Sequence, residues 1–273
     1  IGVFIGAVTF TGSIVAYLKL SAKMKSAPLV LPGKNLINAG ILVAFVALTV
    51  WFVVSPALWM LIVVTALALA LGCEAVSHAQ ADAATLATVF AASGADGHNC
   101  HALCEQLASD DRQISPTRFH NSVHNAAAGY WGIATHSMAP CQVICAFDGS
   151  FSAGLFDALA QVAVDQRPLL LVSYDSEYPE PLHAKRPVPD AAGVALLLSP
   201  RQGERSLARV TVERAAAGAS FSHLAEAELE ALRVQLPSLR ALPMLQLLAR
   251  GQAGSAVIDY LPGYALELGL QPC

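Results

Sequence analysis

The first 72 residues contain no Asp, Glu or Arg, and their charged side chains are four lysines, Lys19, Lys23, Lys25 and Lys34. The rest of the chain carries the other 12 Lys and Arg and all 20 Asp and Glu, a net charge of −8. Over the whole sequence, charged residues make up only 13%, about half of the roughly 25% that is usual in soluble domains. This uneven shortage of charge indicates two parts, residues 1–72 and 73–273, which meet near Gly72-Cys73.

Several motifs are also missing, and each absence excludes a class of protein. No glycine-rich strand–turn–helix fingerprint follows Gly72, so the sequence predicts no nucleotide cofactor. The run Ser150–Gly154 lacks the first glycine of the G-x-S-x-G elbow that α/β-hydrolases use. The net charge of −8 in residues 73–273, without a basic stripe, argues against a nucleic-acid partner.

Apolar runs dominate the first part. Ile1–Leu18, Asn35–Val54 and the shorter Ala57–Leu71 each approach the roughly 20 apolar residues that cross a bilayer. Ser55-Pro56 separates the second run from the third, because proline cannot continue a helix. The sequence therefore predicts an all-α transmembrane hairpin of three spans. The alternative, a buried hairpin of a soluble protein, is disfavoured by the length of the runs.

The lysines predict the orientation of these spans. All four lie in the segment Lys19–Lys34, between the first and second spans, and positively charged loops face the cytoplasm. Two further crossings return the chain to the cytoplasmic side at Cys73. We therefore expect a multi-pass protein of the inner membrane whose second part is cytoplasmic, with its six cysteines as free thiols.

The runs IGVFIGAVTFTGSIVAYLKL and SAPLVLPGKNLINAG resemble part of the membrane domain of the β subunit of proton-translocating NAD(P) transhydrogenase. The resemblance covers about residues 1–72. It does not imply hydride transfer, because the NADP-binding domain of that family has no counterpart here. The predicted spans also contain no acid and no histidine for a proton path.

Beyond residue 85, strand-like and helix-like segments alternate. The predicted strands are Leu86–Ser93, Gln142–Phe147, Pro168–Ser176, Ala192–Ser199 and the run ARVTVERA. We expect the first two of these strands to be buried. Helical periodicity marks HALCEQLAS, HNAAAGYWGIATHS and SFSAGLFDALAQVAVDQ. This alternation predicts a layered α/β domain, and the proline-rich stretch Ser173–Asp190 is expected to run over its surface.

The segments SGADGHNCHALCEQLAS, ISPTRFHNSVHNAAAGYWGIAT and DGSFSAGLFDAL resemble β-ketoacyl-synthase-like proteins of the chain-length-factor type. The resemblance covers about Cys73–Cys273 and fades towards the C-terminus. It implies the N-terminal half of a thiolase-like fold. It also implies two partners, a catalytic ketosynthase and an acyl carrier protein.

Condensing members of that superfamily carry a nucleophilic cysteine at the turn between a buried strand and the next helix, where the helix N-terminus lowers the thiol pKa. In this sequence the equivalent position falls at about Phe147 or Asp148. We expect Cys145 inside the strand as a buried thiol, and Asp148 and Ser150 as N-caps of the helix. His124 is the histidine that such a fold would place nearest. These four polar residues, Cys145, Asp148, Ser150 and His124, are the candidates for catalysis, and none meets all the requirements.

His120 and His124 are four residues apart, which predicts one shared face of a helix that begins near Asn121. Metal binding, acid–base catalysis and a structural role at a subunit contact are the three alternatives, and we favour the third. The candidate metal ligands are Cys100, His101 and Cys104. Their C-x3-C spacing differs from the C-x2-C pairs of zinc ribbons, so no metal site is predicted.

The sequence thus predicts a non-condensing partner that pairs with a ketosynthase and shapes its acyl tunnel, attached to a membrane segment. The alternatives are an incomplete membrane component of a transhydrogenase and a chance fusion whose two parts have no joint function. Whether the chain is itself an enzyme is left open by these residues.

Overall fold

The computed structural model describes residues 56–94 and 96–273, with side chains from Thr65 onward. The first two predicted spans, Ile1–Leu18 and Asn35–Val54, lie outside the described residues. The helices and strands of the described residues, in chain order, are α3 (Pro56–Ala79), β1 (Ala87–Ala92), α4 (Gly97–Ala108), α5 (Pro116–His120), α6 (Ala126–Thr135), β2 (Cys141–Ile144), η1 (Phe147–Gly149), α7 (Ser150–Asp165), β3 (Leu169–Asp175), β4 (Ala192–Leu198), β5 (Ala208–Arg214), α8 (Ala227–Gln235), η2 (Pro237–Ala241), α9 (Leu242–Ala249), β6 (Gly254–Asp259) and β7 (Ala265–Pro272).

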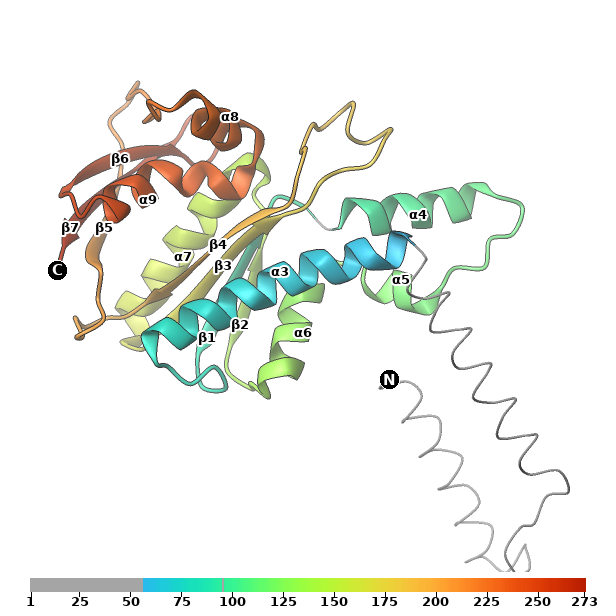
Figure 1. Cartoon of the computed structure of the whole chain (residues 1–273), viewed down its shortest axis with the longest axis horizontal. Helices are drawn as coiled ribbons and strands as arrows, with labels where there is room; N and C mark the ends of the chain where they lie inside the picture. Colours follow the sequence, from blue (N-terminus) through green and yellow to red (C-terminus); the bar gives the residue numbers. More distant parts are fainter. Residues whose placement is uncertain (1–55, 95) are drawn as a thin grey trace, which may run out of the picture. The chain divides into compact units, whose positions relative to one another are not determined.

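Two sheets organise these elements (Figure 1). The first has the order β2-β1-β3-β4, in which β1 runs parallel to β2 and β3, and β4 runs antiparallel to β3. The second is antiparallel, with the order β5-β7-β6. The predicted α/β layered domain is confirmed for this part of the chain.

The central strands are buried on both faces. Successive residues of β1 alternate between two cores: Val89 packs with α7 and the second sheet, and Phe90 packs with α3 and α6. Because neither face meets water, these strands are continuous apolar runs rather than alternating ones. This is why β1 and β3 could be predicted from the sequence.

The third predicted span is part of α3, which packs against β3, β4, α4 and α6. Its Ala68 and Val76 are buried in the same core as Trp131 of α6. Within the described residues, no helix combines the length and apolar character needed to cross a bilayer. The apolar composition of Ala57–Leu71 instead serves, from Thr65 onward, to cover one face of the sheet.

The boundary expected at Gly72-Cys73 falls inside α3, and the compact unit begins at Ser55. Gly72 is a packing residue there, since a Cβ atom at this position would lie 2.7 Å from the Trp131 ring. Two helices can approach closely where glycine replaces a side chain.

Two local expectations differ from the structure. The segment Gln142–Phe147 was expected to be a buried strand, but β2 is a partly exposed edge strand that ends at Ile144. His120 ends α5, His124 lies in the following turn, and α6 begins at Ala126, so the two histidines do not share a helix. Ser115 caps the short helix α5, and this separate helix contains the residues that precede the turn.

Candidate functional site

The carboxyl ends of β2, β1 and β3 meet at one edge of the first sheet, the place where open α/β sheets carry their ligands. The turn η1 follows β2 at this edge, and α7 starts directly after it. Phe147, the first residue of the turn, has a φ angle of +54°. A left-handed backbone costs a non-glycine residue roughly 1–2 kcal/mol, so the surrounding contacts have to impose it.

Ser150 fixes the shape of this turn. Its hydroxyl oxygen accepts a hydrogen bond from the Ala146 N–H at 2.9 Å. It also lies 2.7 Å from the Phe147 carbonyl and 3.1 Å from the Ala92 carbonyl, to which it can donate. Ser150 was expected to cap α7, but the cap residue is Gly149 and no side chain caps that helix. The hydroxyl is therefore occupied in holding the turn against β1.

Cys145 lies one residue beyond β2, not inside the strand, and is exposed. Its thiol donates to the Ala92 carbonyl, with Sγ and O 3.0 Å apart. Partial burial, and then the nearby Asp175 carboxylate, raise the pKa of the Cys145 thiol. Because the thiolate is the nucleophilic form of cysteine, this environment makes Cys145 a poor nucleophile.

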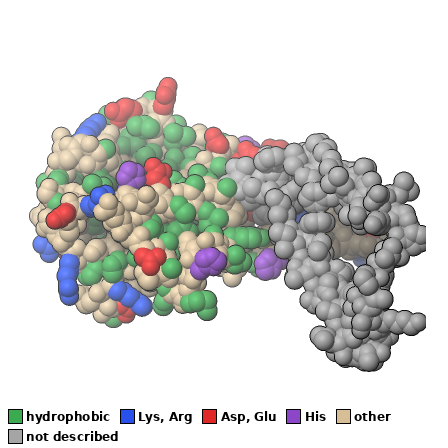
Figure 2. Space-filling view, turned by 60° about the horizontal axis from the view of Figure 1, so that its bottom comes forward, with side chains coloured by type: hydrophobic (Ala, Val, Ile, Leu, Met, Phe, Trp, Pro, Cys, Tyr) green, Lys and Arg blue, Asp and Glu red, His purple; other side chains and the backbone are tan. Residues whose placement is uncertain are grey.

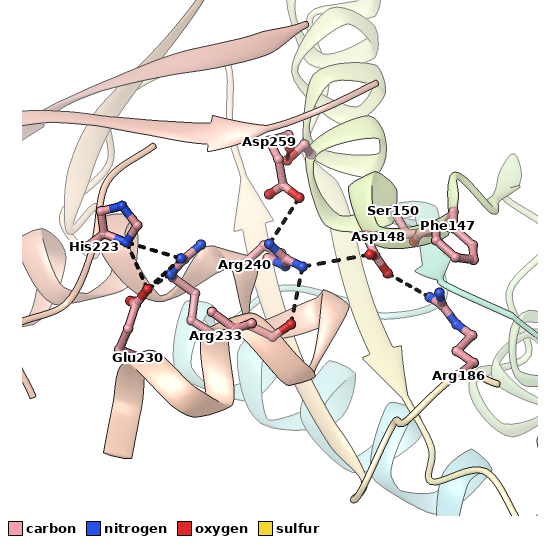
Figure 3. A network of polar contacts seen from close by, with 11 residues as sticks. Phe147, Asp148, Ser150, Arg186, His223, Glu230, Arg233, Arg240 and Asp259 are labelled. Carbon is pink, nitrogen blue, oxygen red and sulfur yellow. Dashed lines mark hydrogen bonds and ion pairs between the residues drawn. The ribbon is translucent and has the colours of Figure 1, made fainter. Parts of the chain in front are cut away.

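Asp148 does not cap α7 either; it belongs to a chain of ion pairs that Figure 3 shows. Its Oδ1 accepts from Arg186 Nη2 at 2.9 Å, and its Oδ2 lies 3.8 Å from Arg240 Nη2. Arg240 also pairs with Asp259 at the end of β6, at 3.3 Å. Arg186 in addition lies over the Phe147 ring, 3.7 Å from its centroid. The network therefore joins the turn to the long β3–β4 loop, to η2 and to the second sheet.

Asp175, the last residue of β3, is a buried carboxylate that joins three elements. Its Oδ1 accepts from the Ser93 N–H after β1 at 3.1 Å, and its Oδ2 accepts from the Ser238 N–H in η2 at 2.6 Å. Burial raises the pKa of Asp175, although these hydrogen bonds act in the opposite direction. Burial likewise raises the pKa of Asp259, against the lowering effect of Arg240.

His124 is not brought to the turn by any contact among the described residues. Its side chain is exposed, and its backbone carbonyl accepts from the Tyr174 hydroxyl at 3.5 Å. His120 is exposed as well, whereas Asn121 between them is buried at 1% relative exposure. Of the two histidines and the asparagine between them, only Asn121 is therefore buried in the fold.

The candidate metal ligands lie together on α4. Cys100 and Cys104 are exposed, and His101 Nε2 lies 3.3 Å from Glu105 Oε1. Burial and the neighbouring Cys104 raise the pKa of the Cys100 thiol. In residues 56–94 and 96–273, no three His, Cys, Asp or Glu side chains lie close enough to share a metal ion.

Sequence reasoning missed Asp175, Arg186, Arg240 and Asp259. A signal existed for Asp175, since an acid that ends a continuous apolar run is placed at the carboxyl edge of a buried strand. No local signal marks Arg186 or Arg240, which lie 38 and 92 positions beyond Asp148. Their partnership with Asp148 arises only from the tertiary fold.

The face of the molecule seen in Figure 2 carries apolar side chains interleaved with single acidic, basic and histidine side chains. On that face, the described residues do not form a continuous stripe of one charge.

Comparison with solved structures shows the same fold in a complex of a ketosynthase with its chain length factor from Xenorhabdus doucetiae. That match has a TM-score of 0.56 and 23% identity, and it covers 76% of this chain and 76% of the chain it matches. A second similar structure is the ishigamide ketosynthase/chain length factor, with a TM-score of 0.49 and 13% identity over 69% of this chain and 73% of that one. The described residues thus adopt a thiolase-like α/β half-domain.

Comparison with sequence families gives two matches. Residues 1–94 match the NAD(P) transhydrogenase beta subunit. Residues 65–250, more than half of the chain, match the N-terminal domain of beta-ketoacyl synthase, and the chain therefore belongs to the beta-ketoacyl synthase family.

Proposed function

We propose that this chain is a non-condensing partner, of the chain-length-factor type, that pairs with a catalytic ketosynthase and shapes the tunnel for the growing acyl chain. The observation that supports this most is Phe147. It is the strained first residue of the strand-to-helix turn, and the resemblance implies that the cysteine of condensing relatives falls at about Phe147 or Asp148. A phenyl ring can neither attack a thioester nor carry an acyl group.

The neighbours of Phe147 do not replace the missing nucleophile. The Ser150 hydroxyl is hydrogen-bonded within the turn, and the Cys145 thiol has a raised pKa and donates to a carbonyl. Among the described residues no histidine contacts either group, so neither has a general base in place. Acyl chains are therefore expected to stay on the ketosynthase and on the acyl carrier protein.

We expect no covalent acyl-enzyme when the purified chain is incubated with acyl-CoA or acyl-carrier-protein donors. Intact-mass spectrometry is the measurement, and Cys145→Ala is expected to give the same unmodified mass as the wild-type chain. A ketosynthase treated with the same donors is the positive control. Stoichiometric acylation that disappears in Cys145→Ala or Ser150→Ala would show that the turn is a working active site.

The proposal includes membrane attachment through residues 1–54. It rests on the match of residues 1–94 with the transhydrogenase beta subunit and on the apolar runs of that segment. We expect the full chain to stay in the membrane fraction after an alkaline carbonate wash. A chain that begins at Ser55 keeps α3 and is expected in the supernatant. Release of the full chain by carbonate would contradict membrane attachment.

A further inference from the structure

The second sheet has an open edge along β5. This strand pairs with β7 on one side, and within residues 56–94 and 96–273 no strand pairs with it on the other. The Cys273 N–H donates to the Leu207 carbonyl, and the Ala215 N–H donates to the Ala265 carbonyl. Because backbone groups alternate in direction along a strand, the odd-numbered residues of β5 bond to β7. The outward N–H and C=O groups, which have no partner among the described residues, belong to Ala208, Val210, Val212 and Arg214.

The outer face of this strand carries charges of both signs. Arg209, Thr211 and Glu213 alternate along β5 and are exposed. In the β5–β7 register Glu213 lies opposite Glu267, which is also exposed. Like charges that face each other across two strands are destabilising. None of the ion pairs in the described part of the chain includes Arg209, Glu213 or Glu267, so none of them offsets this repulsion.

These charges are complementary to those of a second β5 strand. When two copies of β5 lie antiparallel about a two-fold axis at Thr211, Arg209 of each copy lies opposite Glu213 of the other. The outward groups of Val210 then face those of Val212 in the other copy, which is the hydrogen-bonded pairing of an antiparallel ladder. A register shifted by two residues keeps such hydrogen bonds but places Arg209 opposite Thr211 or Ala215. One register therefore satisfies both the hydrogen bonds and the charges.

The same charges select against other strands. Charged side chains usually protect an edge strand from pairing, because an unrelated strand leaves them without a partner. On β5 the charge changes sign about the central Thr211, so a copy of the strand supplies the missing partners and most other strands do not. Apolar surface is also covered in this register. Leu207, which is 71% exposed just before β5, comes opposite Ala215 of the second copy.

We propose that two copies of this chain associate through the outer edges of their β5 strands, antiparallel about Thr211, so that the two second sheets become one continuous sheet. The two-fold axis makes each contact occur twice, which is the usual property of an isologous dimer. The guanidinium of Arg209 from one copy then offsets the repulsion between Glu213 and Glu267 of the other. This inference concerns the second sheet and does not depend on the proposed function.

Charge reversal in the full chain tests the pairing. Arg209→Glu and Glu213→Arg each turn both attractive contacts into repulsive ones, and we expect each variant to self-associate about tenfold more weakly than the wild type. A mixture of the two variants restores both attractive contacts, and the double variant does the same, so both should associate as the wild type does. The measurement is co-purification of two differently tagged copies from detergent extracts over a series of concentrations.

A cysteine on the two-fold axis tests the register before extraction. Thr211 faces its own copy in a non-hydrogen-bonded pair, where the Cα atoms lie about 4.5 Å apart, within the range that a disulfide spans. We expect Thr211→Cys to form a covalent dimer on mild oxidation, in a yield above the background that the six native cysteines set. Arg209→Cys is the matched control, because its copy lies four residues further along the ladder, about 14 Å away, and should give only the background.

Arg112→Glu and Asp110→Arg make the same two charge changes at exposed residues outside β5 and should leave self-association unchanged. Thermal unfolding establishes that the variants are folded, and where a reversal variant is not, Thr211→Cys decides alone. The proposal is overturned if wild-type copies do not co-purify, or if they co-purify equally well with either charge reversed. It is also overturned if Thr211→Cys gives no covalent dimer above background, since the two copies would then meet elsewhere.

Discussion

Gly149→Ala is expected to destabilise the fold by about 3 kcal/mol, at the upper end of what one added methyl group costs in a packed region. A Cβ atom at residue 149 would lie 1.8 Å from the carbonyl oxygen of Tyr260 and 2.8 Å from its carbonyl carbon. Both contacts are with backbone, so no side-chain rotation can relieve them. The φ angle of Gly149 is −85°, which alanine adopts freely, so the cost comes from contact and not from conformation.

The backbone of Tyr260 has little room to move away. Its N–H donates to the Tyr264 carbonyl at 3.2 Å, which closes the connection between β6 and β7. Displacing it would also disturb Asp259, the partner of Arg240. The substitution therefore pushes the turn and the second sheet apart.

Thermal unfolding of the full chain measures the effect, and a loss of about 3 kcal/mol corresponds to a fall in Tm of roughly 6–12 °C for a domain of this size. Gly129→Ala is the matched control, because an added Cβ there has no neighbour within 4 Å. In the helix α6 it should be neutral or stabilise by up to about 1 kcal/mol. Equal Tm values for the two variants would show that the turn and the β6–β7 connection are not in contact.

Several parts of the fold could be predicted because local pattern and tertiary role agree in them. β1 and β3 are apolar runs bounded by turn residues, and both of their faces are covered. The run QVICAF looks the same in the sequence, yet β2 lies at the edge. A short apolar run indicates a strand without indicating which strands lie beside it.

The third apolar run was ambiguous for a physical reason. A helix that is apolar on all sides suits a bilayer, and it also suits a position on a sheet among other helices. The sequence matches reflect this ambiguity, since residues 65–94 are shared by the transhydrogenase and the ketosynthase matches. Packing decides between the two for the described residues: Ala68, Gly72 and Val76 lie one turn apart and face the core.

The position of the candidate site could be predicted from the sequence, but the contacts among its residues could not. The motif placed the turn at Phe147 and Asp148, and the structure has η1 there. Which charges neutralise Asp148 depends on Arg186 in a loop and Arg240 in η2. Ion pairs between distant segments leave no periodic pattern in a sequence. The expected caps failed because Ser150 and Asp148 had stronger partners in the folded chain than the free N–H groups of α7.

Asp175→Ala is expected to destabilise the fold by about 2–4 kcal/mol, because it leaves two N–H groups, that of the partly buried Ser93 and that of the buried Ser238, without an acceptor. These two groups lie directly after β1 and in η2, so the carboxylate of Asp175 links β3 to both of these segments. Urea unfolding of the full chain at a series of pH values is the measurement. Asp190→Ala, which removes an exposed carboxylate whose hydrogen bond is made to the next residue, is the matched control and should have little effect.

The pH dependence of this loss tests its cause. Burial raises the pKa of Asp175 in the folded chain above the value of about 3.9 that it has when unfolded. Between these two pKa values the folded state binds more protons than the unfolded state, so the stability of the wild-type chain falls as the pH rises through that window. The Asp175→Ala variant lacks this carboxyl group, so its stability does not include the part of the fall with pH that Asp175 causes. We therefore expect the stability difference between wild type and variant to be largest at the acid end and to narrow as the pH rises through the folded pKa, with no further change above it. A difference that widens with pH would show that the two N–H donors outweigh burial and that the pKa of Asp175 is lowered.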